Sequence, residues 1–194
     1  LPTFRRQRQM CIRDSNHGAM GGSAEQMDTQ YESINDEAPS GEVDPAFKEQ
    51  LQSVYNAYIP MKNAFVESDA DAVKAEAEKV QASLLAVDME LVKGDLHMRW
   101  MSVLEILNSE ISTIIRAGDL SAQRIAFADF NDAFYNTFEL FGLQSGTVYY
   151  QYCPMANGDK GAFWLSEVNE IRNPYFGDEM LRCGETRDTL EFKN

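Results

Sequence analysis

Residues 91–121 read LVKGDLHMRWMSVLEILNSEISTIIRAGDLS, and this stretch decides which fold to expect. Apolar residues recur along it at steps of three or four, which is the spacing of one buried helix face. The triplets KGD (93–95) and AGD (117–119) bound this segment. In each triplet the glycine can end one helix and the aspartate, Asp95 or Asp119, can cap the next. The stretch therefore predicts one long amphipathic helix between two very short loops.

Three more segments with this spacing flank the quoted one. The first opens at Asp44, a good cap, and Pro45, a residue suited to a first helical turn. Pro60 inside it is expected to kink the helix or to end it locally. The last segment closes at Gly142. The four apolar seams are Phe47, Leu51, Val54, Tyr55, Tyr58 and Phe65; Val73, Ala77, Val80, Leu84, Val87 and Leu91; Leu96, Trp100, Val103, Leu107, Ile111 and Ile114; and Phe127, Phe130, Phe134, Phe138 and Phe141.

Loops this short make consecutive helices antiparallel. The predicted fold class is mainly α, an up-down-up-down four-helix bundle over residues 45–142. Residues 147–152 and 162–165 are aromatic or β-branched and predict short strands, and 186–192 predicts a further extended piece. Residues 143–194 are therefore expected to form a small, irregular, β-containing module packed on the bundle.

The first 44 residues differ from the rest of the chain. Residues 1–15 carry four arginines in an otherwise acidic sequence, and residues 6–15 resemble translated sequencing-adaptor read-through. We interpret this segment as an artefact, with a basic arm as the alternative, and expect that a signal sequence is missing from the chain. Residues 16–44 are polar and poor in apolar side chains, and they predict a disordered linker.

The composition limits the classes of partner. The net charge is −14, and a surface this acidic does not suit nucleic acid, whose phosphates require basic patches. The same charge attracts cations. No apolar run reaches the ~18 residues of a membrane span, so no membrane-spanning segment is predicted in the chain as given. No catalytic triad, glycine-rich phosphate loop or Glu-x-x-His pattern occurs, and we predict that the protein is not an enzyme.

Sulfur-bearing residues cluster in two pairs near the C-terminus. Cys153 and Met155 are two residues apart, which places both side chains on one side of an extended segment. Met180 and Cys183 are three apart and would share a face of a helical turn. Thiolate and thioether ligands select soft metals, above all Cu(I). If the chain folds back between the pairs, these four residues predict a site for Cu(I), with Ag(I) as a second candidate.

Several other readings of these residues stay open. A Cys153–Cys183 disulfide would stabilise the fold by about 3–4 kcal/mol on a chain-entropy estimate, and the methionines could be core filler. A redox pair is a third reading, although no Cys-x-x-Cys occurs. His97 and Met101 lie one helical turn apart at the start of the third helix and are candidate auxiliary ligands. The alternative is that His97 is an ordinary, partly exposed helix-start residue.

The C-terminal motifs resemble a bacterial exported domain of unknown function that is common in Bacteroidetes. That domain occurs alone or fused to periplasmic adaptor subunits of copper/silver efflux pumps. The resemblance spans about residues 45–190. It rests on VYNAY (54–58), VDM (87–89), HMRWM (97–101), YYQYCPMA (149–156), GAFWLS (161–166) and NPYFGDEMLRCG (173–184).

The resemblance implies a periplasmic or cell-envelope protein that binds metal, and copper in particular. The Tyr-x-Cys-Pro-Met start is also similar to short heavy-metal-binding modules. This chain departs from those modules at Ala156, where they have histidine, and in its longer gap to the second cysteine. We therefore expect a soft-metal domain acting in copper capture, delivery or efflux, with efflux adaptor or pump subunits as partners. The alternative is a non-metal adaptor or interaction domain stapled by a disulfide.

Overall fold

The structure is a computed structural model that describes residues 42–193. The predicted segments 1–15 and nearly all of 16–44 lie outside this range. The long elements are α1 (Pro45–Val66), α2 (Ala70–Leu85), α3 (Gly94–Arg116), α4 (Leu120–Phe141), β1 (Gly146–Cys153), β2 (Ala162–Ser166) and β3 (Glu185–Phe192). Three short helices join them: η1 (Met89–Leu91), α5 (Ala156–Asp159) and η2 (Gly177–Glu179).

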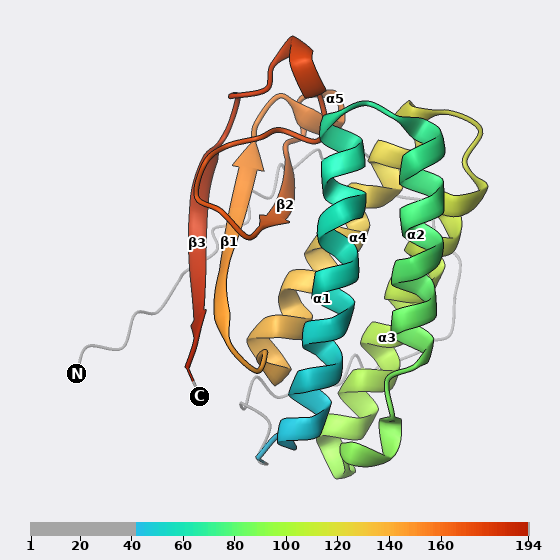
Figure 1. The fold of residues 1–194 in the computed structure, drawn as a ribbon, viewed down its shortest axis with the longest axis vertical. Helices are drawn as coiled ribbons and strands as arrows, with labels where there is room; N and C mark the ends of the chain where they lie inside the picture. The colour runs from blue at the N-terminus through green and yellow to red at the C-terminus, as the bar shows by residue number, and fades with distance from the viewer. Residues whose placement is uncertain (1–41, 194) are drawn as a thin grey trace, which may run out of the picture. The chain divides into compact units, whose positions relative to one another are not determined.

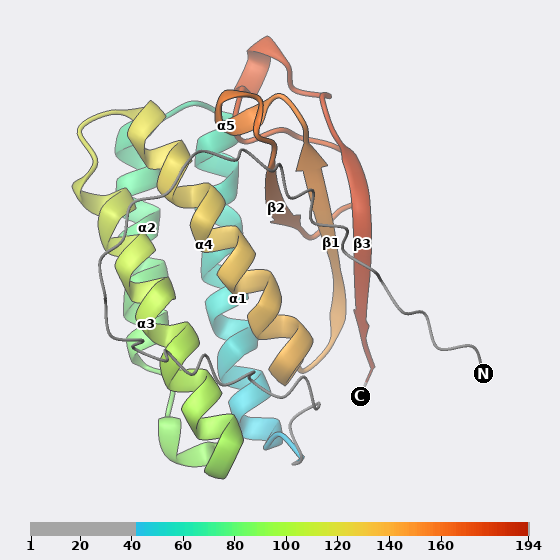
Figure 2. The ribbon, with the colours of Figure 1, turned by 180° about the vertical axis from the view of Figure 1, so that it is seen from behind.

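The four long helices pack as an antiparallel bundle, which confirms the predicted fold class. α1 and α2 face the viewer in Figure 1, and the view from behind in Figure 2 shows α3 and α4 side by side. Each helix runs opposite to the one before it. None of the helices among residues 42–193 is long and apolar enough to cross a membrane.

Aspartates cap three of the four long helices. The side chains of Asp44, Asp69 and Asp119 accept hydrogen bonds from backbone N–H groups in the first turns of α1, α2 and α4. The predicted cap at Asp95 is wrong, because α3 begins at Gly94 and has no side-chain cap. Asp95 instead accepts a hydrogen bond from Arg99 Nε at 2.9 Å within the first turns of α3.

Helix α1 continues through Pro60 to Val66 and does not end at the proline. A proline inside a helix removes one donor and leaves the carbonyl four residues earlier without its usual partner. Here that carbonyl belongs to Asn56, and both Asn56 and Pro60 lie on the exposed side of α1. Water can reach the carbonyl there, which makes the interruption tolerable.

Helix α2 is shorter than its apolar seam predicts. The seam continues to Leu91 in sequence, but α2 ends at Leu85 and Leu91 belongs to the separate turn η1. The cause is Asp88, whose side chain accepts a hydrogen bond from Glu90 N at 2.9 Å and so favours a new turn over a longer helix. Val87 is still buried in the core because the turn folds back onto the bundle.

Aromatic rings fill the centre of the bundle. All five phenylalanines of the α4 seam are buried. The ring of Tyr58 on α1 stacks against Phe127 and Phe130, with centroids 5.9 and 6.2 Å away. At the other end of the core, Trp100 meets Phe47 edge-on at 5.1 Å.

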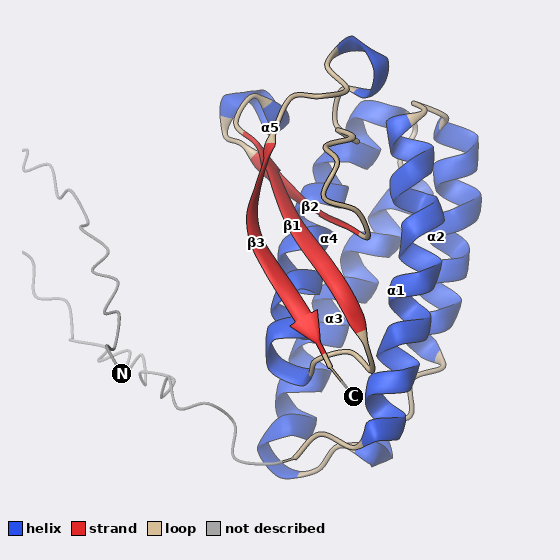
Figure 3. Ribbon diagram, turned by 60° about the vertical axis from the view of Figure 1, so that its left-hand side comes forward, coloured by secondary structure: helices blue, strands red, loops and turns tan. Residues whose placement is uncertain are grey.

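The C-terminal module contains a three-stranded antiparallel sheet with the order β2-β1-β3. It packs beside α1 and α4, and β3 is an outer strand (Figure 3). Tyr150 lies opposite Asp188 but the next residue, Gln151, lies opposite Thr186. Arg187 is therefore the extra residue of a β-bulge, and its guanidinium lies 5.0 Å from the centroid of the Tyr152 ring.

Stacked rings join the sheet to α4. The Tyr150 ring on β1 lies 3.9 Å from Tyr135 of α4 and 4.4 Å from Phe163 of β2, measured between centroids. The Tyr150 hydroxyl also donates a hydrogen bond to Asp132 at 2.9 Å. This face of β1 therefore packs on the bundle. The opposite face contacts the loop between β2 and β3.

A buried hydroxyl joins α1, α4 and β2. The hydroxyl of Tyr58 donates to Asn131 Oδ1 at 2.6 Å and accepts from the backbone N–H of Leu165 at 3.1 Å. Asn131 in turn donates to the Phe127 carbonyl at 2.7 Å. Burial raises the pKa of Tyr58 well above its usual value, so this hydroxyl keeps its proton and remains a donor.

Replacing Tyr58 by phenylalanine is expected to lower the free energy of unfolding by about 2–3 kcal/mol, because it leaves two buried groups without a partner. The matched control is Tyr55→Phe, since the Tyr55 hydroxyl is buried with no hydrogen-bond partner among the described residues. Removing it should cost less than about 0.5 kcal/mol or stabilise the protein. Urea unfolding of both variants measures the difference, and equal losses would contradict this account of the junction.

A buried lysine forms a second link between α1 and the C-terminal module. Lys62 Nζ lies 2.8 Å from Glu167 Oε2, and the two side chains are 2% and 39% exposed. Burial lowers the pKa of Lys62, while the hydrogen bond and charge of Glu167 act in the opposite direction. The lysine therefore depends on one carboxylate that follows β2 directly.

Candidate functional site

The thiols of Cys153 and Cys183 lie together although they are distant in sequence. Their Sγ atoms are 3.2 Å apart, and both cysteines are free thiols. Cys153 is fully buried at the end of β1, whereas Cys183 is half-buried in the segment that leads into β3. The structure thus brings together the two cysteines of the predicted site.

Strand pairing explains this convergence. Tyr152 on β1 lies opposite Glu185, the first residue of β3. Cys153 follows Tyr152, and Cys183 precedes Glu185 by two residues, so antiparallel pairing carries both cysteines to the same end of the sheet. The connecting loop of residues 154–182 alone would not hold the two thiols close together. The register between β1 and β3 does so.

Gly184 permits the close approach of Cys183 to β1. Its φ is +139°, a backbone conformation that side chains rarely adopt. A Cβ atom at this position would lie 2.8 Å from both the Tyr152 carbonyl oxygen and Trp164 Cη2. No other residue fits here without moving the strand or the indole.

Asn173 holds the segment that carries Cys183. It is fully buried. Its Nδ2 donates to the Cys183 carbonyl at 2.8 Å, and its Oδ1 accepts from Tyr175 N at 2.8 Å. Its backbone N–H donates to the Leu181 carbonyl, and its own carbonyl accepts from Gly177 N. The side chain and backbone of this one buried residue therefore hold residues 175–183 in place.

Gln151 does the same for the first part of this loop. It is fully buried on β1, on the face that carries Cys153. Its Nε2 donates to the carbonyls of Val168 and Asn169, each at 3.2 Å. The loop between β2 and β3 is thus tied to the sheet by a polar side chain on the face that carries Cys153.

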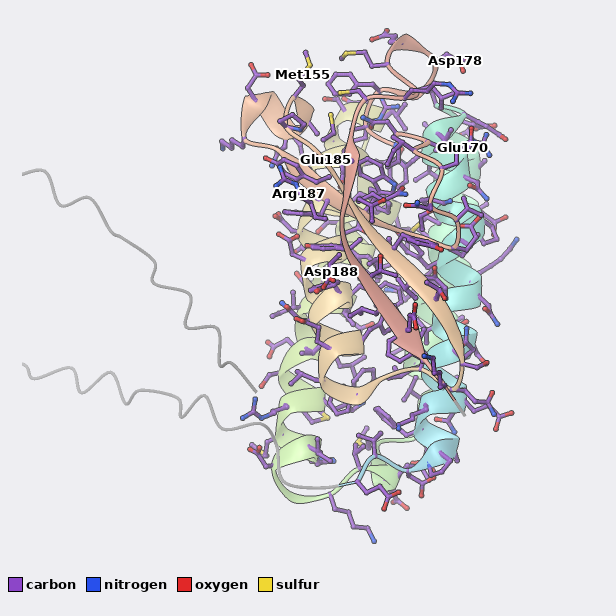
Figure 4. All side chains as sticks on the ribbon, turned by 90° about the vertical axis from the view of Figure 1, so that its left-hand side faces the viewer. Met155, Glu170, Asp178, Glu185, Arg187 and Asp188 are labelled. Carbon is purple, nitrogen blue, oxygen red and sulfur yellow. The ribbon has the colours of Figure 1, made fainter. Side chains whose placement is uncertain are left out.

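The two predicted methionine ligands flank the thiols in different ways. Met155 is 47% exposed, and Figure 4 shows its side chain at the outer surface of the module. Its backbone is helical rather than extended (φ −86°, ψ −11°), so the predicted arrangement of Cys153 and Met155 on one side of an extended segment is wrong. Met180 is partly buried and begins a turn closed by the hydrogen bond from Cys183 N to its carbonyl at 3.0 Å.

The structure does not bring the auxiliary candidates to the thiols. His97 and Met101 lie in the first turns of α3, beside η1. Figure 1 shows this end of the bundle at the bottom of the view, while the end of β1 and α5 lie at the top. His97 and Met101 therefore belong to a different surface of the protein from Cys153 and Cys183.

The chemistry open to the cysteine pair is narrow. The hydrogen bond with Cys153 and, to a lesser degree, burial raise the pKa of the Cys183 thiol, whereas catalytic thiols have lowered pKa values. Within residues 42–193 no three or more His, Cys, Asp or Glu side chains are arranged to hold a metal. A four-ligand zinc site made from such residues is therefore absent from this part of the chain. Two thiols at this distance suit a soft ion of low coordination number or a disulfide.

Sequence reasoning missed the two buried amides that build the site. Asn173 precedes a proline, and Gln151 lies inside an aromatic strand, so neither stands out in the sequence as a site residue. A polar residue in a strand that is otherwise buried is a signal of a hydrogen-bonded junction. The carbonyls that accept from Asn173 Nδ2 and Gln151 Nε2 are 10 to 18 residues away along the chain, which no local pattern specifies. Only the contact of Asn173 Oδ1 with Tyr175 N is local.

The comparison with known proteins finds a match for the helical part of the chain. Residues 54–146 match the model of a family described as Protein of unknown function (DUF3347). The match begins inside α1 and ends at the first residue of β1, so it stops before Cys153. No curated protein and no solved structure matches the chain. The resemblance to a domain of unknown function is supported at this level, while the exported, copper-related identity stays a prediction.

Proposed function

We propose that the protein is an exported soft-metal-binding domain that captures Cu(I), or Ag(I), through the thiolates of Cys153 and Cys183. The observation that supports this proposal is the 3.2 Å separation of the two Sγ atoms, which come from opposite ends of a 30-residue interval. Thiolate sulfur is the ligand type that selects Cu(I). The net charge of −14 favours the approach of a cation.

The residues fit such an ion after a small adjustment. At metal–sulfur distances near 2.3 Å, two sulfurs in a tetrahedral arrangement lie about 3.8 Å apart, and in a linear one about 4.6 Å. Cys183 lies half-exposed outside the regular strand, so its side chain can move outward by this amount. Met180 and Met155 have flexible thioethers close to the thiols in sequence and would supply additional weak ligands.

The biological role follows from this arrangement and from the resemblance to exported copper-related domains. One ligand is buried and one is accessible, so a partner with its own soft ligands can attack the ion from the Cys183 side. We infer capture of Cu(I) in the periplasm or cell envelope and transfer to an efflux adaptor or pump subunit. The thiols must lose protons when the ion binds, so binding releases protons.

Cu(I) titration of the reduced protein against a chromogenic chelator tests the proposal. The reference is Cys11→Ser, which removes the third cysteine and keeps the pair. We expect it to bind one tight equivalent that depends on the two cysteines. In Cys153→Ser/Cys183→Ser in the same background, the tightest remaining binding should be at least about 100-fold weaker, because each lost ligand costs on the order of tenfold or more. Equal affinities for the two proteins would remove the metal proposal.

The same thiol separation favours a second candidate, a non-metal adaptor or interaction domain stapled by a Cys153–Cys183 disulfide. A bond across 30 residues would add about 3–4 kcal/mol of stability on the chain-entropy estimate. The intact mass under non-reducing conditions separates the candidates. A loss of two hydrogens that persists in glutathione buffer, with no Cu(I) binding that depends on the two cysteines, would favour the staple.

A further inference from the structure

Exposed methionines gather at the end of the bundle away from the cysteine pair. Met89 in η1 is 42% exposed, and Met98 and Met101 in the first turns of α3 are 66% and 39% exposed. Met61, by contrast, is fully buried in the core. Three thioethers at one surface are unusual, because methionine is normally an interior residue.

A histidine among them is held in the orientation that metal-binding histidines adopt. His97 Nδ1 lies 3.1 Å from the Met89 carbonyl oxygen. A carbonyl only accepts, so Nδ1 carries the proton, and in the neutral ring Nε2 then has a free lone pair. Metal-binding histidines typically donate their other ring N–H to a backbone carbonyl or a carboxylate, which fixes the ring. The described residues make no hydrogen bond to Nε2 of this half-buried ring.

Helical spacing places two of the methionines within a turn of His97 on α3. His97 and Met101 are four residues apart, and Met98 and Met101 are three apart, so each pair shares a face of α3. The carbonyl contact with His97 brings η1, and with it Met89, against the same turn. Methionine has three rotatable side-chain bonds, so these sulfurs can converge on one point.

We propose that His97, Met98 and Met101, with Met89 beside them, form a second binding site for a soft monovalent cation such as Cu(I) or Ag(I). One imidazole nitrogen and two or three thioethers are soft, uncharged ligands that select Cu(I) over harder ions. The site contains no thiol, so disulfide formation between Cys153 and Cys183 leaves it intact. It is independent of the function proposed above, because its residues lie at the opposite end of the bundle (Figure 1).

The experiment uses the full chain with all three cysteines replaced by serine and with methyl-¹³C methionine, titrated with Ag(I). We expect saturable shifts in the methyl signals of Met98 and Met101 and in the ring signals of His97. The methyl signal of Met61 should stay fixed, and it also reports that the core is folded. Met98→Leu/Met101→Leu, which keeps the apolar volume, should weaken binding at least about tenfold, as should His97→Ala.

The absence of shifts at His97, Met98 and Met101 would overturn the proposal and leave these side chains as an apolar surface. Shifts that persist with unchanged affinity in both variants would overturn it as well. Because the protein contains no thiol in this experiment, its failure leaves the cysteine proposal untouched. Failure of the cysteine proposal likewise leaves this titration unaffected.

Discussion

Replacing Asn173 by alanine is expected to lower the free energy of unfolding by about 3–5 kcal/mol and to separate Cys183 from Cys153. The side chain is fully buried and satisfies the Cys183 carbonyl and the Tyr175 N–H. Each buried polar group left without a partner costs about 1–3 kcal/mol, and the cavity adds to this. The loss should fall mainly on residues 175–183, which depend on this amide.

Urea unfolding measures the change in stability, and the rate of Cys153–Cys183 disulfide formation under a mild oxidant measures the change in thiol proximity. The control is Asn169→Ala, because Asn169 lies in the same loop but is exposed, and within residues 42–193 its side chain hydrogen-bonds only Thr186. This variant should lose less than about 1 kcal/mol and keep the oxidation rate. If both variants behave alike, Asn173 does not hold the cysteine segment.

Glu167→Gln and Lys62→Met are expected to have unequal effects although they remove the same ion pair. Without Glu167, the buried Lys62 ammonium loses its partner, which should cost about 2–4 kcal/mol. Lys62→Met removes the buried charge together with its desolvation cost, so its stability should stay within about 1 kcal/mol of the parent or exceed it. The remaining Glu167 is already 39% exposed and can be solvated.

The pH dependence provides an independent readout. Burial lowers the pKa of Lys62 below its usual 10.5, and loss of Glu167 should lower it further. Between the folded-state pKa and 10.5 the unfolded chain binds the proton and the folded chain does not, so stability rises with pH in this window. Glu167→Gln should therefore gain stability between neutral pH and pH 10 relative to Glu167→Gln/Lys62→Met. The tyrosines are the same in both proteins, so their titration cancels in the difference between the two unfolding free energies. A difference that does not change with pH would contradict a buried, charged Lys62.

The fold could be predicted because its signals are local. Apolar residues at steps of three and four define each helix, and aspartates such as Asp119 mark where helices begin. The wrong predictions, the length of α2 and the cap of α3, concern aspartates for which two local hydrogen bonds are possible. Asp88 forms a new turn instead of continuing α2, and Asp95 pairs with Arg99 instead of capping α3.

The site could be predicted only in part because its geometry depends on pairing between distant segments. The spacing of sulfur residues identified Cys153 and Cys183, and the register of β1 and β3 joins them. The same spacing assigned Met155 to an extended segment, but the chain leaves the strand at Pro154 and turns. His97 and Met101 were grouped with the thiols by chemistry alone, and chemistry carries no information on which end of a bundle a residue occupies.

The bulge at Arg187 also bears on how the open side of the sheet meets other chains. β3 is an edge strand, and an edge with unpaired backbone groups invites a strand of another molecule, which can lead to aggregation. Here the extra residue twists the strand, and the charged side chains of Glu185 and Arg187 are exposed on it (Figure 4), while Asp188 accepts a hydrogen bond from Tyr135 of α4. A foreign strand would have to follow an irregular, charged backbone, so this edge disfavours sheet extension between molecules.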